Sequence, residues 1–67
     1  MFVKIGKTYV RPGNIQQFNI VDNNLFEVRY ITFSGDIEIE KVESNDAEHS
    51  IKVIINECNQ IEQPTNN

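Results

Sequence analysis

Carboxylates are plentiful in this sequence, and the clearest pair that could perform acid–base chemistry lies in a strand-like repeat. Glu38 and Glu40 alternate with isoleucines in the segment Ile37-Glu38-Ile39-Glu40. Both carboxylates would project from the same side of a strand, roughly 7 Å apart. Acid–base work also needs a convergent base, an oxyanion donor or a set of metal ligands, and the sequence pattern offers none. We therefore expect no catalytic pair here.

The single histidine and the single cysteine are also unsuited to acting together. His49 and Cys58 are nine residues apart, which on a helix places them about 180° from each other. They could then neither share a metal ion nor serve as base and nucleophile. Cys58 is expected to be a buried structural thiol and His49 to be exposed. The sequence predicts a protein that is not an enzyme and that has no metal site and no cofactor.

Charge is unevenly distributed along the 67 residues. Residues 1–33 hold four basic and two acidic residues, a net +2, whereas residues 34–67 hold two basic and eight acidic residues, a net −6. The acidic half predicts contact with a basic site on a protein partner, with candidate residues Glu38, Glu40, Glu43, Glu48 and Val53.

The basic half provides an alternative binding site. Cations interleaved with aromatic side chains can hold phosphates and stack bases, which would suit a nucleic acid or a small anionic ligand. The net charge of −4 opposes polyanion binding, so this remains the second hypothesis. Its candidate anion-binding residues are Lys4, Lys7, Arg11 and Arg29, accompanied by Tyr9 and Tyr30.

The composition favours a sheet as the scaffold that positions these residues. The chain has ten Ile, six Val and six aromatic residues against one Leu and one Ala, and branched and aromatic side chains pack well on pleated surfaces. Strands are expected over residues 2–5, 8–10, 15–21, 25–33 and 37–40. In the last of these, the isoleucines are expected to face inward and the glutamates outward.

Four turn signals separate these strands. Gly6 suits the first central position of a two-residue hairpin turn. The segment Arg11-Pro12-Gly13-Asn14 is typical of a type II turn, with positive φ at Gly13. Residues 22–24 and 34–36 are rich in Asn, Asp, Ser and Gly, as turns usually are.

The segment over residues 45–62 predicts an amphipathic helix, although residues 51–55 alone would also suit a strand. Six side chains fall within an arc of about 120° at helical spacing, namely Ala47, Ile51, Ile54, Ile55, Cys58 and Ile61. Ser44 or Asn45 is expected to cap the start.

These elements predict a mainly β (α+β) fold. It would be a small antiparallel β-meander or partly open barrel of about five strands, closed by one C-terminal helix. Residues 1–62 form the single domain and residues 63–67 a disordered tail. No apolar segment is long enough to cross a membrane, so a cytoplasmic location is expected. In style, with short strands, tight turns, one helix and many Ile and Asn residues, the sequence resembles short proteins of phages and bacteria.

Self-association is also expected. The chain is short and its single cysteine allows no intrachain disulfide, so its own core provides little spare stability. The strand over residues 25–33 carries apolar residues on both faces, and one helix covers only one. Glu57 and Glu62 lie near the helix C-terminus, where Arg11 or Arg29 of a second subunit could compensate their charge. A dimer is the expected oligomer, with a closed monomeric barrel as the alternative.

The function predicted from the sequence is therefore that of a small self-associating binding protein. It would dock on a protein partner as an inhibitor or adaptor, in the manner of a phage-type accessory or counter-defence protein in the host cytoplasm. The alternative is a binder of a small anionic ligand or nucleic acid through the basic N-terminal half.

Overall fold

The computed structural model describes residues 1–62 and confirms a mainly β fold with a C-terminal helix. Its elements are β1 (Val3–Ile5), β2 (Thr8–Val10), the short 3-10 helix η1 (Pro12–Asn14), β3 (Ile15–Asp22), β4 (Leu25–Ile31), β5 (Ile37–Glu43) and α1 (Ala47–Glu62). The predicted tail over residues 63–67 lies outside the described residues.

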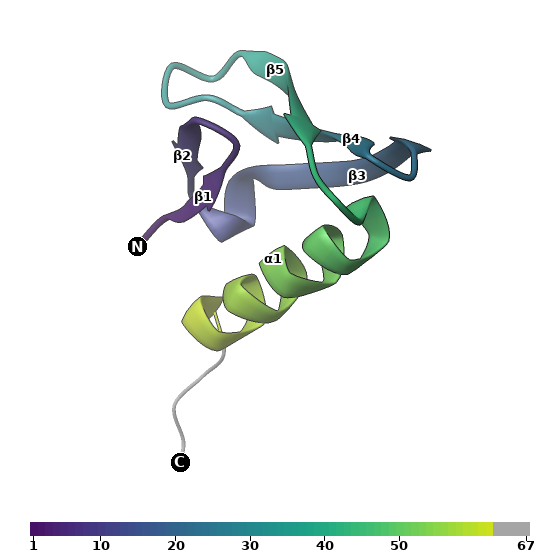
Figure 1. The fold of residues 1–67 in the computed structure, drawn as a ribbon. Coiled ribbons are helices and arrows are strands. Elements are labelled where there is room, and N and C mark those ends of the chain that lie inside the picture. Colours follow the sequence, from purple (N-terminus) through teal and green to yellow (C-terminus); the bar gives the residue numbers. More distant parts are fainter. Residues whose placement is uncertain (63–67) are drawn as a thin grey trace.

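The five strands form two antiparallel sheets. β1 and β2 make a hairpin, and β3, β4 and β5 make a three-stranded meander. The meander is thus the arrangement adopted, without closure into a barrel. α1 runs along one face of the meander, and the β1–β2 hairpin lies on that same side (Figure 1).

The hydrophobic core lies between the meander, the hairpin and the helix. Alternate residues of β4 supply its centre, since Phe26 and Val28 are almost completely buried. Ile51 and Ile54 of α1 belong to the same buried cluster. The core is completed by Val3, Ile5, Val10, Tyr30 and Ala47.

The face that β5 turns to this core differs from the expectation. Val28 pairs with Glu40 and Arg29 with Ile39, so the glutamates share the core-side face and the isoleucines lie on the opposite one. Ile37 and Ile39 are 53% and 57% exposed. The prediction that the isoleucines point inward was wrong, because Val42, opposite Phe26, is the residue through which β5 packs against the core.

Glu40 has a structural role on this side of the sheet. Its carboxylate accepts hydrogen bonds from the Lys7 backbone N–H at 3.5 Å and from the Thr8 hydroxyl at 3.3 Å. Gly6 takes the positive φ that the hairpin turn needs, +59°, and a Cβ there would lie 2.8 Å from Glu40 Oε2. The hairpin turn therefore approaches β5 closely, and a side chain at position 6 would displace the Glu40 carboxylate.

The turn after β2 is not of type II. Pro12–Asn14 form one 3-10 turn, in which the Asn14 N–H donates to the Arg11 carbonyl at 2.9 Å. Gly13 does not adopt the expected positive φ. A Pro-Gly pair is compatible with either turn, because proline fixes only its own φ.

The helix prediction is confirmed across residues 51–55, with two corrections. Asp46 provides the N-cap, since its Oδ1 accepts the His49 N–H at 3.1 Å; the prediction of Ser44 or Asn45 was wrong. Ile55 is 42% exposed, so the buried stripe is narrower than expected on that side. Ala47, Ile51 and Ile54 are buried, and Cys58 and Ile61 pack against them in part.

Candidate binding surfaces

The acidic candidates lie on three separate parts of the molecule. Glu38 and Glu40 are on the core-side face of β5, whereas Glu43 pairs with Leu25 on the opposite face. Glu48 and Val53 are exposed on α1, and Glu48 forms an ion pair with Lys52 at 3.8 Å. The structure therefore assembles no single acidic surface from these five residues.

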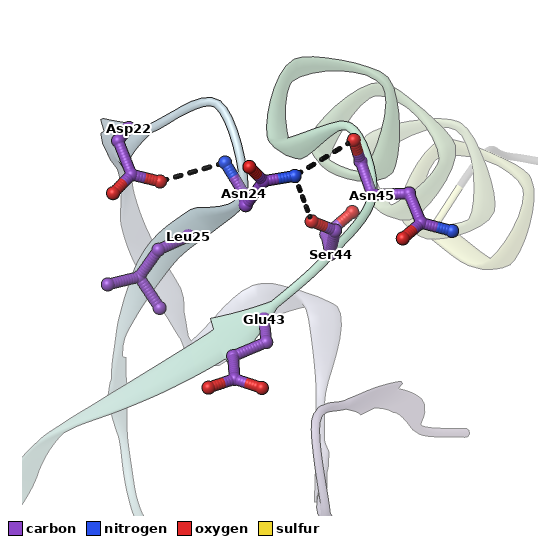
Figure 2. Close-up of a pocket in the computed structure, with 6 residues that line it drawn as sticks. All are labelled: Asp22, Asn24, Leu25, Glu43, Ser44 and Asn45. Carbon is purple, nitrogen blue, oxygen red and sulfur yellow. Dashed lines mark hydrogen bonds between the residues drawn. The ribbon is translucent and has the colours of Figure 1, made fainter.

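Asp22 and Glu43 line one pocket at a corner of the sheet, where they flank Leu25 from the two neighbouring strands (Figure 2). Asp22 Oδ1 accepts the backbone N–H of Asn24 at 2.8 Å. The Asn24 side-chain amide in turn donates to the carbonyls of Ser44 and Asn45, at 3.0 and 3.2 Å. These bonds fasten the β3–β4 turn to the connection between β5 and α1, so the polar groups of the pocket serve the fold.

Three of the four basic candidates gather on the β1–β2 hairpin. Val3, Ile5 and Val10 face the core, and their neighbours along the strands therefore point outward. Lys4 lies opposite Tyr9, Lys7 is in the turn, and the Arg11 guanidinium lies 5.9 Å from the centre of the Phe2 ring. Arg29 lies on β4, facing away from the core, and Tyr30 is buried, so neither belongs to this group.

The meander also has an uncovered face, as expected from the apolar residues on both sides of the strand over residues 25–33, but the sequence did not indicate which residues of the neighbouring strands complete it. We call it the open face; it consists of Gln17, Asn19, Asp22, Leu25, Glu27, Arg29, Ile31, Ile37, Ile39, Lys41 and Glu43. Ile37 and Ile39 are its most exposed apolar side chains, and Leu25 and Ile31 are half-buried. The full strand 37–43 could have revealed it, because Val42 shares a face with the glutamates and not with the isoleucines.

Polar side chains border the isoleucines on the open face. A shallow depression there is lined by Gln17, Asn19, Glu27, Arg29 and Ile39. The Asn19 amide donates to Glu27 Oε1 at 3.4 Å. The apolar side chains Ile31, Ile37 and Ile39 thus form a patch at one end of the open face, and polar and charged residues, Arg29 among them, border it.

The described residues carry neither a cluster of metal ligands nor a membrane-spanning helix. Among the side chains of residues 1–61, no group of three or more His, Cys, Asp or Glu is placed to hold a metal ion. Helix α1 falls short of the length and apolar character needed to cross a membrane, as does any other helix in this range. No protein-family model matches the sequence, and no curated protein or solved structure is significantly similar to it.

Proposed function

We propose that this protein is a non-catalytic binding module that pairs with a second copy of itself through the open face and docks, as a pair, on a protein partner. The observation that carries the proposal is the exposure of Ile37 and Ile39, 53% and 57%, on a sheet whose other face is covered by α1. Patches of exposed apolar side chains that are bordered by polar residues mark interaction sites on soluble proteins.

The size of the open face sets the expected strength of the pairing. Strands of seven residues extend about 23 Å, and three strands are about 14 Å wide. This footprint is smaller than the roughly 800 Å² that each partner buries in a standard interface. The dimer is therefore expected to be weak, with a dissociation constant in the micromolar range.

The charges of the open face are compatible with a second copy. Its three acidic and two basic residues contribute −1 to the chain's −4, so most of the charge that would repel another copy lies elsewhere. Asp22 and Glu43 are at one end, and Arg29 is toward the other.

Docking on a partner would use the surfaces that pairing leaves free. Glu38 and Glu48 are exposed on other parts of the molecule and suit a basic site on the partner. An inhibitor or adaptor role of the phage type, exercised in the cytoplasm, belongs to this proposal. The pairing of Glu57 or Glu62 with an arginine of a second subunit also stays a prediction.

Sedimentation equilibrium tests the pairing, with Ile39→Lys and a matched Val53→Lys variant. Val53 is an apolar residue on α1, 44% exposed, so both variants place a lysine at an exposed apolar position. We expect the unmodified protein and Val53→Lys to dimerise alike and Ile39→Lys to remain monomeric, with circular dichroism confirming that all three fold. An unmodified protein that is monomeric up to millimolar concentration, or loss of pairing in Val53→Lys alone, would overturn the proposal.

A further inference from the structure

The outer side of the β1–β2 hairpin is a second surface with its own chemistry. We call it the hairpin face; it consists of Phe2, Lys4, Lys7, Tyr9 and Arg11. Phe2 and Tyr9 are 54% and 66% exposed. Because the two strands pair with Lys4 opposite Tyr9, the aromatic rings are diagonal neighbours, about 7–8 Å apart at their Cα atoms.

The cations of the hairpin face form no ion pair with a described carboxylate. The ion pair between Lys52 and Glu48 is the one formed among the side chains that the structure describes. Glu40 approaches the turn, but it accepts the backbone N–H of Lys7. Lys4, Lys7 and Arg11 therefore contribute +3 to a chain whose net charge is −4, beside the single negative charge of Glu40, and none of the three cations is held in an ion pair with a described carboxylate.

A small cavity extends the aromatic surface toward the end of β4. It is lined by Phe2, Tyr9, Val10, Arg11, Asn14, Tyr30, Ile31, Thr32 and Phe33. β4 ends at Ile31, two residues earlier than predicted, and the following turn leaves Phe33 94% exposed. Three exposed rings thus border the same region as the Arg11 guanidinium.

We propose that the hairpin face, together with the adjoining Phe33, binds single-stranded nucleic acid. Unpaired bases would stack on the exposed rings of Tyr9 and Phe33, and the phosphates would lie near Lys4, Lys7 and Arg11. Single strands are favoured over duplexes because only unpaired bases offer their flat faces to aromatic side chains. They are favoured over acidic peptides because the carboxylates of a peptide would use the cations and leave the rings without a role.

Three phosphate contacts set the expected dependence on salt. For single strands, the logarithm of the affinity falls with the logarithm of the salt concentration with a slope of about −0.7 per phosphate. Three contacts predict a slope of about −2, or about a twenty-fold loss of affinity between 50 and 200 mM salt. The negative remainder of the chain weakens the attraction, so the affinity is expected to be micromolar at 50 mM salt.

Fluorescence anisotropy of labelled oligo-dT of about 12 nucleotides tests this proposal. Lys4→Gln should lower the slope by about 0.7 and Tyr9→Ala should weaken binding at least five-fold. Lys52→Gln, which removes one positive charge from α1, should change neither slope nor affinity by a comparable amount. These variants leave the open face intact, so the oligomeric state reports separately on the proposed pairing.

Three results would overturn the proposal. They are the absence of binding at sub-millimolar protein concentration in 50 mM salt, tighter binding to the matching duplex, and equally effective competition by poly-glutamate. The last result would show that the face attracts any polyanion and that its aromatic rings take no part.

Discussion

Replacing Gly6 by alanine tests how the β1–β2 hairpin is held against the meander. Gly6 has φ +59°, and an added Cβ would lie 2.8 Å from Glu40 Oε2 and 3.3 Å from a methyl group of Val42. The carboxylate is the mobile end of a long side chain and can move away. Moving it breaks its hydrogen bonds to Lys7 and Thr8.

The expected loss has two parts. A positive φ costs a residue with a side chain about 1–2 kcal/mol, and the two long hydrogen bonds of Glu40 contribute about 1 kcal/mol together. The smaller freedom of alanine in the unfolded chain offsets about 0.4–1 kcal/mol. Gly6→Ala should therefore lower the free energy of unfolding by about 2 kcal/mol, a large share of the stability of so short a chain.

Alanine substitutions at the two other glycines distinguish the cost of backbone strain from the cost of losing the Glu40 hydrogen bonds. Gly35 has φ +94° and Gly13 has no positive φ, and neither has an atom within 4 Å of the added Cβ. Gly35→Ala should therefore cost about 1 kcal/mol from backbone strain alone, and Gly13→Ala should be neutral or slightly stabilising.

Urea denaturation followed by circular dichroism, at one fixed protein concentration, measures all three variants. In a Glu40→Ala background, Gly6→Ala should cost about 1 kcal/mol less than in the unmodified protein. If Gly6→Ala is no more destabilising than Gly35→Ala, or if its cost does not depend on Glu40, then the hairpin is not held by this contact.

Three further predictions are tested by urea denaturation of other variants. Ile54→Asp would bury an unpaired charge and should cost several kcal/mol, whereas Lys52→Asp should have little effect; similar losses would mean that the helix buries a different stripe. Asp46→Ala should cost about 1 kcal/mol by removing the N-cap, while an equal loss in Asn45→Ala would restore the predicted cap. Asn24→Ala should cost about 1–2 kcal/mol because two hydrogen bonds are lost, and an unchanged midpoint would contradict the structural role of the corner pocket.

The elements of this fold could be predicted from the sequence where the pattern extends over enough residues. Alternation along residues 15–21 placed Phe18 and Ile20 on one face, as the structure shows. The apolar stripe over residues 47–61 was a stronger signal than the strand propensity of residues 51–55. A helix of sixteen residues repeats the helical spacing of its apolar side chains over several turns. Gly6 indicated a hairpin turn because glycine adopts the positive φ of such turns without strain.

The predictions that were wrong rested on short segments whose sequence is compatible with two structures. Four alternating residues, 37–40, could not show which side faces the core, since that depends on pairing with β4. Ser44, Asn45 and Asp46 can all cap a helix, and the position of the first turn against the sheet decides among them.

The candidate sites illustrate the same limit. The hairpin brings Lys4, Lys7 and Arg11 together because they are close in sequence and alternate with buried residues. The acidic candidates were grouped by charge along the chain, and the fold separates them. Alternation along residues 37–43 could have shown that the isoleucines face away from the core, but the open face comes from three strands, so strand register is needed to assemble its full set of residues.

The proposed pairing of two copies through the open face is tested most directly by NMR on a mixture of carbon-13-labelled and unlabelled chains. An isotope-filtered NOE experiment detects contacts between labelled and unlabelled molecules only. We expect such contacts from the methyl groups of Ile37 and Ile39, which are exposed in the single chain. Intermolecular contacts confined to Val53 and Ile55 of α1, or none at millimolar concentration, would contradict the account.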